Sequence, residues 1–157
     1  MNLYVKQKVF SWGDRFSVYD PDGNERYTVQ GEVFSWGKKL HLYDRFGNEQ
    51  AFIRQQLMHF RPTYTVERNG TVFAEVVKRI TFFRQAYEIS GPDWTVEGSF
   101  WNHEYKIYCG DRVITSVRKE WFTWGDAYEI NIDPSIDEIA ALATVLIIDA
   151  CIEEQND

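Results

Sequence analysis

Residues 10–29 read FSWGDRFSVYDPDGNERYTV, and residues 34–53 repeat the pattern as FSWGKKLHLYDRFGNEQAFI. The two copies begin 24 residues apart, and the signature returns at Phe82 and, as FTWGDAYEINI, at Phe122. Self-similarity at a fixed spacing is typical of a fold built from repeated supersecondary units. The repeat therefore predicts the organisation of the whole chain.

Each unit of the repeat reads as a strand, a tight turn and a second strand. The first strand carries two large apolar residues two positions apart, which places both on one face of a sheet. These pairs are Phe16/Val18, Leu40/Leu42, Tyr64/Val66, Tyr87/Ile89, Tyr105/Ile107 and Tyr128/Ile130. Connections such as Asn69-Gly70 supply the positive φ angles of tight hairpin turns. Each unit is therefore a predicted β-hairpin.

Twelve strands result when the units are counted along the chain. Their predicted ranges are 3–9, 15–19, 26–33, 39–43, 50–57, 62–67, 71–78, 84–89, 94–100, 104–108, 112–119 and 126–131. Short connections favour an antiparallel meander, and closure removes its two exposed edges. Twelve strands make a barrel too wide to be filled by its own side chains. We therefore predict a mainly β fold, a closed antiparallel twelve-stranded β-barrel with a filled lumen, forming one domain over 1–157.

The filler is DPSIDEIAALATVLIIDACI, residues 133–152, the only convincing helix in the sequence. It is apolar nearly all the way round, so it has to be buried in protein or in lipid. Its longest apolar run, Ile139 to Ile148, falls well short of the roughly 20 residues of a membrane span. Asp133 is the predicted N-cap and Pro134 the first helical residue of a helix over about 134–152. We expect this helix to lie inside the barrel. We also expect that the protein is not an integral membrane protein.

Close packing of helix and wall gives two further expectations. Gly31, Ala74 and Gly98 lie in second strands of hairpins, where small residues allow a helix to approach the wall. Asp149 is an isolated carboxylate in the final turns of the helix, and a buried carboxylate is costly unless it is paired. We predict that Asp149 is paired with an Arg, Lys, Tyr or Trp of the wall.

These features together resemble the LURP-one-related family, whose fold is that of the tubby C-terminal domain and the phospholipid scramblases. The resemblance rests on Phe10-Ser-Trp-Gly13, Phe34-Ser-Trp-Gly37 and the C-terminal block that ends in Ile139 to Asp149, and it covers essentially the whole chain. It implies a twelve-stranded barrel around a central C-terminal helix, and it does not imply an enzyme. Tubby domains bind phosphoinositides through basic side chains, so the resemblance also raises lipid binding.

Composition and charge narrow the classes of function. The 157 residues carry a formal net charge of −7, which argues against a general nucleic-acid binder because such proteins need a basic footprint. The two cysteines, Cys109 and Cys151, make no disulfide framework. The first ten residues lack the apolar segment of an export signal. We therefore expect reduced thiols in a cytoplasmic, or membrane-peripheral, protein.

The chain shows no catalytic, cofactor or metal motif. His41, His59 and His103 are scattered, and Trp-Gly precedes a strand rather than the helix of a phosphate-binding loop. Carboxylates do cluster before the helix, where scramblases are proposed to bind calcium. They are Asp126, Glu129, Asp133, Asp137 and Glu138. Because the calcium-loop spacing is absent and helix capping accounts for Asp133 and Asp137, we expect no metal site, no cofactor and no enzyme.

Charges sort by the two ends of the predicted barrel. The tight-turn end is acidic and holds Asp20, Asp22, Glu25, Asp44, Glu49, Glu67, Asp93 and Asp111. The opposite end, here called the basic end, holds Arg15, Lys38, Lys39, Arg61, Lys78, Arg79, Arg84, Arg118 and Lys119, with Trp12, Trp36, Trp101, Trp121 and Trp124 near it. Strand parity also brings the C-terminal end of the helix out at the basic end. The cations can therefore hold an anionic headgroup, or neutralise the protein's own helix end.

Three hypotheses of function remain open at this point. The first is a non-enzymatic binding or interaction scaffold with an unknown protein partner. The second is a peripheral phospholipid or phosphoinositide module of tubby or scramblase type. Its candidate headgroup residues are Lys38, Lys39, Lys78, Arg79, Arg118 and Lys119. The third is an enzyme or small-ligand carrier, which needs lumen space that the helix would remove.

Overall fold

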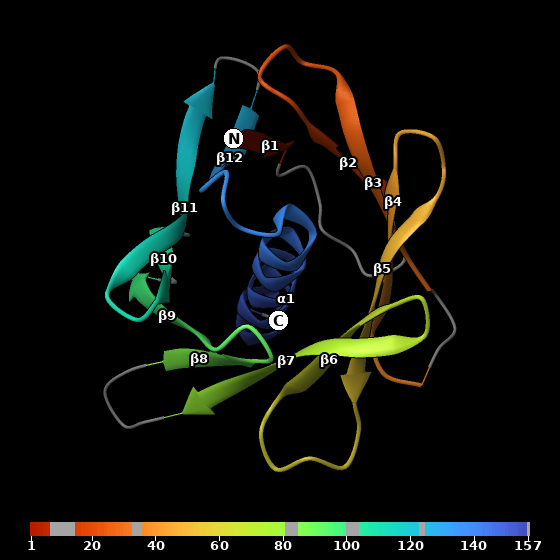
Figure 1. Ribbon diagram of the computed structural model, residues 1–157, viewed down its shortest axis with the longest axis vertical. Coiled ribbons are helices and arrows are strands. Elements are labelled where there is room, and N and C mark those ends of the chain that lie inside the picture. The colour runs from red at the N-terminus through yellow and green to blue at the C-terminus, as the bar shows by residue number, and fades with distance from the viewer. Residues whose placement is uncertain (7–14, 33–35, 81–84, 100–103, 123–124, 157) are drawn as a thin grey trace.

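Twelve antiparallel strands close into a barrel around one helix in the computed structural model (Figure 1). The structure describes residues 1–6, 15–32, 36–80, 85–99, 104–122 and 125–156. The strands are β1 Asn2–Lys6, β2 Arg15–Tyr19, β3 Glu25–Gly31, β4 Lys39–Asp44, β5 Glu49–Gln56, β6 Thr63–Arg68, β7 Thr71–Ile80, β8 Gln85–Ser90, β9 Trp94–Ser99, β10 Glu104–Cys109, β11 Arg112–Phe122 and β12 Gly125–Ile132. Each strand pairs with its neighbours in sequence, and β1 closes the barrel against β12. The predicted fold class is confirmed.

The repeated hairpins are shaped by one turn motif, Asp-X-X-Gly-Asn. In the first copy, Oδ1 of Asp20 accepts hydrogen bonds from the amides of Asp22 and Asn24, both at 2.9 Å. In the second copy, Oδ1 of Asp44 accepts equivalent bonds at 2.9 Å from the amides two and four residues on. Gly23 and Gly47 take φ angles of 82° and 83°, a region that glycine enters without strain. The sequence repeat thus reflects a repeated turn as well as a repeated strand.

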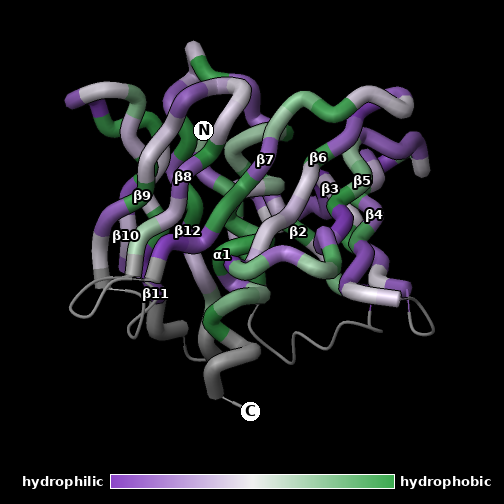
Figure 2. The backbone as a smooth tube through the Cα atoms, turned by 90° about the horizontal axis from the view of Figure 1, so that it is seen from below, coloured by the Kyte–Doolittle hydropathy of each residue, from purple (hydrophilic) through white to green (hydrophobic). Residues whose placement is uncertain are grey.

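The barrel lumen is filled by α1, Glu138–Asn156 (Figure 1). Every residue from Ile139 to Ile152 is buried, so the helix has no solvent-facing side over this stretch. The one hydroxyl in the run, Thr144 Oγ1, donates to the carbonyl of Ala140 at 2.8 Å. Figure 2 shows α1 running through the strands and its C-terminal end projecting beyond them. The predicted central helix and its direction are confirmed.

The helix begins one turn later than the sequence predicts. Asp133 does not cap it: Oδ1 of Asp133 accepts the Ser135 amide at 2.8 Å, which forms a separate turn before the helix. The N-cap is Asp137, whose Oδ1 accepts the amides of Ile139 and Ala140 at 3.0 and 3.1 Å. The expected range of 134–152 is therefore wrong at both ends, since Pro134 lies in the turn and the helix continues to Asn156.

Two arginines of the wall fix the start of the helix. Arg68, at the end of β6, forms a bidentate pair with Asp137 whose longer bond is 2.6 Å. Arg26, on β3, pairs with Glu138 at 2.7 Å. Burial raises the pKa of the Asp137 carboxyl, but the Arg68 guanidinium and the backbone amides outweigh it and hold that pKa below its usual value. The helix is thus fastened to the acidic end of the barrel by charge-assisted hydrogen bonds.

The helix lies nearest to β5, β6, β7 and β12. Ala51 on β5 and Ala74 on β7 are both buried in the core, and their small side chains fit this close approach, as expected for Ala74. Gly98 has a different role. A Cβ at Gly98 would lie 2.5 Å from Cα of Tyr105 on the neighbouring strand, so this glycine allows close packing of β9 against β10 rather than of the helix against the wall.

The helix start yields a first prediction. Asp137→Ala removes the cap and the Arg68 pair, and we expect it to lower the free energy of unfolding by about 2 kcal/mol. Asp133→Ala removes only a turn contact and should cost less. Urea denaturation of both variants tests this, and equal losses would contradict the assignment of the N-cap.

The pKa of Tyr27 yields a second prediction. Burial, and then the hydrogen bond from Tyr27 Oη to Glu138 Oε1 at 2.6 Å, raise this pKa from 10.0 to about 12. Between these values the folded protein keeps a proton that the unfolded chain has released, so stability falls as pH rises through that window. In Tyr27→Phe this fall should be shallower, as measured by urea denaturation at a series of alkaline pH values. An unchanged pH dependence would show that Tyr27 does not contribute.

Candidate functional site

The basic end of the barrel is built from loops that join hairpins and from the end of the helix. Its described part includes residues 36–38 before β4 and residues 57–62 between β5 and β6. The two segments lie side by side, because the Lys38 amide donates to Gln55 Oε1 at 3.1 Å and the Gln55 amide donates to the Lys38 carbonyl at 2.8 Å. Leu57 continues this contact, since a Cβ at Gly37 would lie 3.1 Å from its Cδ2.

Among the candidate headgroup residues, Lys39, Arg79 and Arg118 form ion pairs with neighbouring carboxylates. Arg79 of β7 lies 2.7 Å from Glu88 on β8, and Arg118 of β11 lies 2.6 Å from Glu129 on β12. Lys39 Nζ lies 4.0 Å from Glu32. Glu129 is buried, whereas the side chains of the other two carboxylates are partly exposed. All three pairs reduce the positive charge available to an anionic ligand.

The other cations do not join those three in one cluster. Lys78 alternates with Ala74 and Val76 along β7 and is only 4% exposed, so it lies on the lumen side of the wall. Lys119 pairs in register with Tyr128, a buried residue, and is partly buried itself. Lys38 precedes β4 in the loop contact described above. The structure therefore divides the six residues between the outer face, the lumen face and one loop.

Asp149 has a tyrosine partner in the lumen. Oη of Tyr105 donates to Asp149 Oδ1 at 3.3 Å, and it lies 3.5 Å from the carbonyl oxygen of Val145 on the previous turn of the helix. Burial, and then the charge of Asp149, raise the pKa of Tyr105 well above its usual value. The wall partner expected for Asp149 is therefore a tyrosine, held neutral beside the carboxylate.

The tyrosines around Asp149 form a layer that the sequence reading missed. Tyr64, Tyr87, Tyr105 and Tyr128 are all buried, and the charge environment of Tyr105 includes Tyr87 and Tyr128. They occupy the same position in successive repeats, the first large apolar residue of each unit. This shared position could have predicted the layer, because equivalent positions of repeated hairpins lie at a similar height along the barrel axis.

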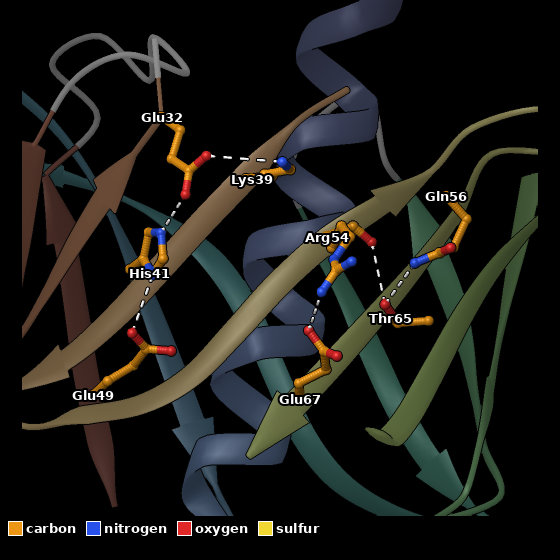
Figure 3. Close-up of polar contacts among 8 residues, drawn as sticks. All are labelled: Glu32, Lys39, His41, Glu49, Arg54, Gln56, Thr65 and Glu67. Atoms are coloured by element: carbon orange, nitrogen blue, oxygen red, sulfur yellow. Dashed lines mark hydrogen bonds and ion pairs between the residues drawn. The ribbon is translucent and has the colours of Figure 1, made fainter. Parts of the chain in front are cut away.

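On the outer wall, polar side chains form a band across β3 to β6, which Figure 3 shows. His41 lies between two carboxylates, with Nε2 2.7 Å from Glu32 and Nδ1 3.1 Å from Glu49. Its ring also stacks on Phe52, with centroids 4.7 Å apart. His41 faces outward, as predicted. These contacts bridge neighbouring strands on the outer wall.

The acidic cluster before the helix is taken up by protein contacts. Arg118 pairs with Glu129, Arg26 with Glu138 and Arg68 with Asp137, while Asp133 holds its turn. The Asp126 side chain and His103 lie outside the described residues. Within the described part of the chain, no three His, Cys, Asp or Glu side chains are grouped so that they can hold a metal ion.

Large apolar side chains are exposed on the two basic-end loops, and the sequence reading did not anticipate this. The relative exposures are 87% for Trp36, 47% for Leu57, 101% for Met58 and 106% for Phe60. Residues 57–61 are all exposed, and they follow directly after β5. The sequence feature that could have indicated this exposure is the Leu-Met-His-Phe run at residues 57–60, which joins two predicted strands. Trp12, Trp101 and Trp124, with the Trp121 side chain, lie outside the described residues.

Among the described residues, no helix is both long enough and apolar enough to cross a bilayer.

Three comparisons with known proteins each match nearly the whole chain. A family model described as LURP-one-related matches residues 1–149. A Bacillus subtilis protein described as uncharacterized protein YxjI is 34% identical over 157 residues, covering 100% of this chain and 97% of that protein. The X-ray structure of the Arabidopsis thaliana protein AT5G01750 matches with a TM-score of 0.65 at 18% identity, covering 99% of this chain and 91% of that one. This last likeness supports the fold.

The lumen pair yields a third prediction. Tyr105→Phe removes the donor to a buried carboxylate and should lower the free energy of unfolding by about 1–3 kcal/mol. In a double-mutant cycle with Asp149→Asn, the two changes should be non-additive by at least about 0.5 kcal/mol. Additive losses, or an Asp149→Leu variant as stable as the parent, would contradict the pairing.

Proposed function

Because the chain belongs to the LURP-one-related family, we propose that it is a non-enzymatic binding module that works in the cytoplasm. The barrel serves as a rigid scaffold, and the contact surface lies at its basic end. The observation that carries this proposal is the exposure of Trp36, Met58 and Phe60 on two adjoining loops. Large apolar side chains gathered on a surface commonly mark an interaction site.

The fate of the polar groups supports a non-enzymatic role. Asp149 and Tyr105 bind each other in the lumen, and the carboxylates before the helix are held by arginines. The helix occupies the space that a small-ligand carrier would need. Because these charged groups stabilise the fold itself, we assign contact with a partner to the exposed loops.

A second candidate is the peripheral phospholipid or phosphoinositide module, with Lys38, Lys39, Lys78, Arg79, Arg118 and Lys119 as headgroup residues. The concentration of cations at one end of an acidic protein favours it. The ion pairs of Lys39, Arg79 and Arg118 weigh against it, because a headgroup would have to displace Glu32, Glu88 and Glu129. We therefore place the scaffold first and direct headgroup capture second.

Site-specific photo-crosslinking in the native host tests which end makes contact. A benzophenone amino acid would replace Phe60 in one variant and Phe46 in a matched control. Phe46 is 74% exposed in the turn at the acidic end. We expect adducts, with protein or lipid, from position 60 and none above background from position 46. Adducts from position 46 alone would contradict the proposed contact surface.

A further inference from the structure

The loop between β5 and β6 presents its apolar residues outward rather than into the core. Met58 and Phe60 are fully exposed at 101% and 106%, and the loop arches away from the wall at the lower edge of Figure 1. Trp36 on the neighbouring loop is 87% exposed. The two adjoining loops therefore present large apolar side chains to solvent.

The backbone of this loop is strained at Met58, one of its two fully exposed apolar residues. Met58 has a φ of 68°, a left-handed conformation that is unfavourable for a residue with a Cβ and is usually left to glycine or asparagine. Its side chain makes no use of that conformation inside the fold, because it is fully exposed. A strained, exposed methionine is consistent with a residue kept for contact outside the molecule.

The loop is held in place by its base and flanked by cations. The Thr63 hydroxyl donates to the Arg61 carbonyl at 2.9 Å, and the Lys78 amide donates to the Pro62 carbonyl at 3.0 Å. Arg61 is exposed and His59 lies between the two apolar tip residues. Lys38 is joined to Gln55 at the start of the same surface. Large apolar side chains and the cations Arg61 and Lys38 thus share the same pair of loops. This combination suits a bilayer interface, in which anionic headgroups overlie acyl chains.

We propose that the paired loops 36–38 and 57–61 dock on the surface of a phospholipid bilayer by inserting Met58 and Phe60 between headgroups, with Trp36 at the interface. This inference rests on the proposed function, because it names the partner of the same contact surface. The driving force here is burial of apolar side chains, whereas headgroup capture by the six candidate cations is driven by charge. Apolar insertion resists salt, whereas binding through exposed charges is screened by it.

Vesicle co-sedimentation tests the proposal with the full chain. The probe is phosphatidylcholine vesicles with about one-third phosphatidylserine, at about 0.15 M and about 0.5 M NaCl. We expect the parent protein to bind at both salt concentrations. Met58→Ser combined with Phe60→Ser should weaken partitioning by at least about tenfold, since both large side chains lose apolar burial. Phe46→Ser, which changes an exposed apolar residue at the opposite end, should bind like the parent.

Met58→Gly separates loss of contact from loss of folding. Glycine accepts the φ of 68°, so this variant should keep or raise the melting temperature while its vesicle partitioning falls. Equal partitioning of the parent and the double variant would overturn the inference, as would binding that disappears at the higher salt. Failure of the parent to bind vesicles would also overturn it. If the parent fails to bind vesicles but position 60 forms protein adducts in the host, the bilayer proposal is wrong and the proposed function is supported. If neither is seen, both proposals are contradicted.

Discussion

The structure depends on burying a helix that is apolar on every side. Each residue from Ile139 to Ile152 is buried, which in water requires a closed surround. The wall has the reciprocal need, because twelve strands enclose more space than their own side chains fill. The barrel therefore shields the apolar helix from water, and the helix fills the barrel lumen. The helix lies nearest to β5, β6, β7 and β12, and the small side chains of Ala51 and Ala74 allow its approach to β5 and β7.

The two ends of the helix are fixed by different chemistry. At the acidic end, arginines of β3 and β6 bind Glu138 and Asp137 and neutralise the charge of these two carboxylates. Near the basic end, Asp149 lies in the buried lumen and accepts a hydrogen bond from Tyr105. Much of the polar chemistry that looks functional in the sequence is thus devoted to placing the helix. The apolar side chains exposed on loops 36–38 and 57–61 have no such role in the fold.

Strand and helix patterning could be predicted from the sequence because each strand places alternate residues in one core. Leu40/Leu42 and Tyr128/Ile130 gave correct strand faces for that reason. The helix start could not be predicted, since Asp133 and Asp137 are both good caps locally and the choice depends on Arg68, 69 residues away from Asp137. The six candidate cations share an end of the barrel but not a face, because alternation sends Lys78 and Arg79 to opposite sides. The Leu57-to-Phe60 run lies at a predicted strand end and in the connection that follows it, and only the fold shows that these large side chains are exposed.

The central claim is that α1 remains the core of the barrel while the loops make contact with partners. Hydrogen–deuterium exchange of the α1 backbone amides, with and without phospholipid vesicles, tests it most directly. The account predicts that amides from Ala141 to Ala150 exchange as slowly as the slowest strand amides, and that vesicles leave them unchanged. Faster exchange of these amides when vesicles are added would mean that the helix leaves the lumen, and would contradict the account.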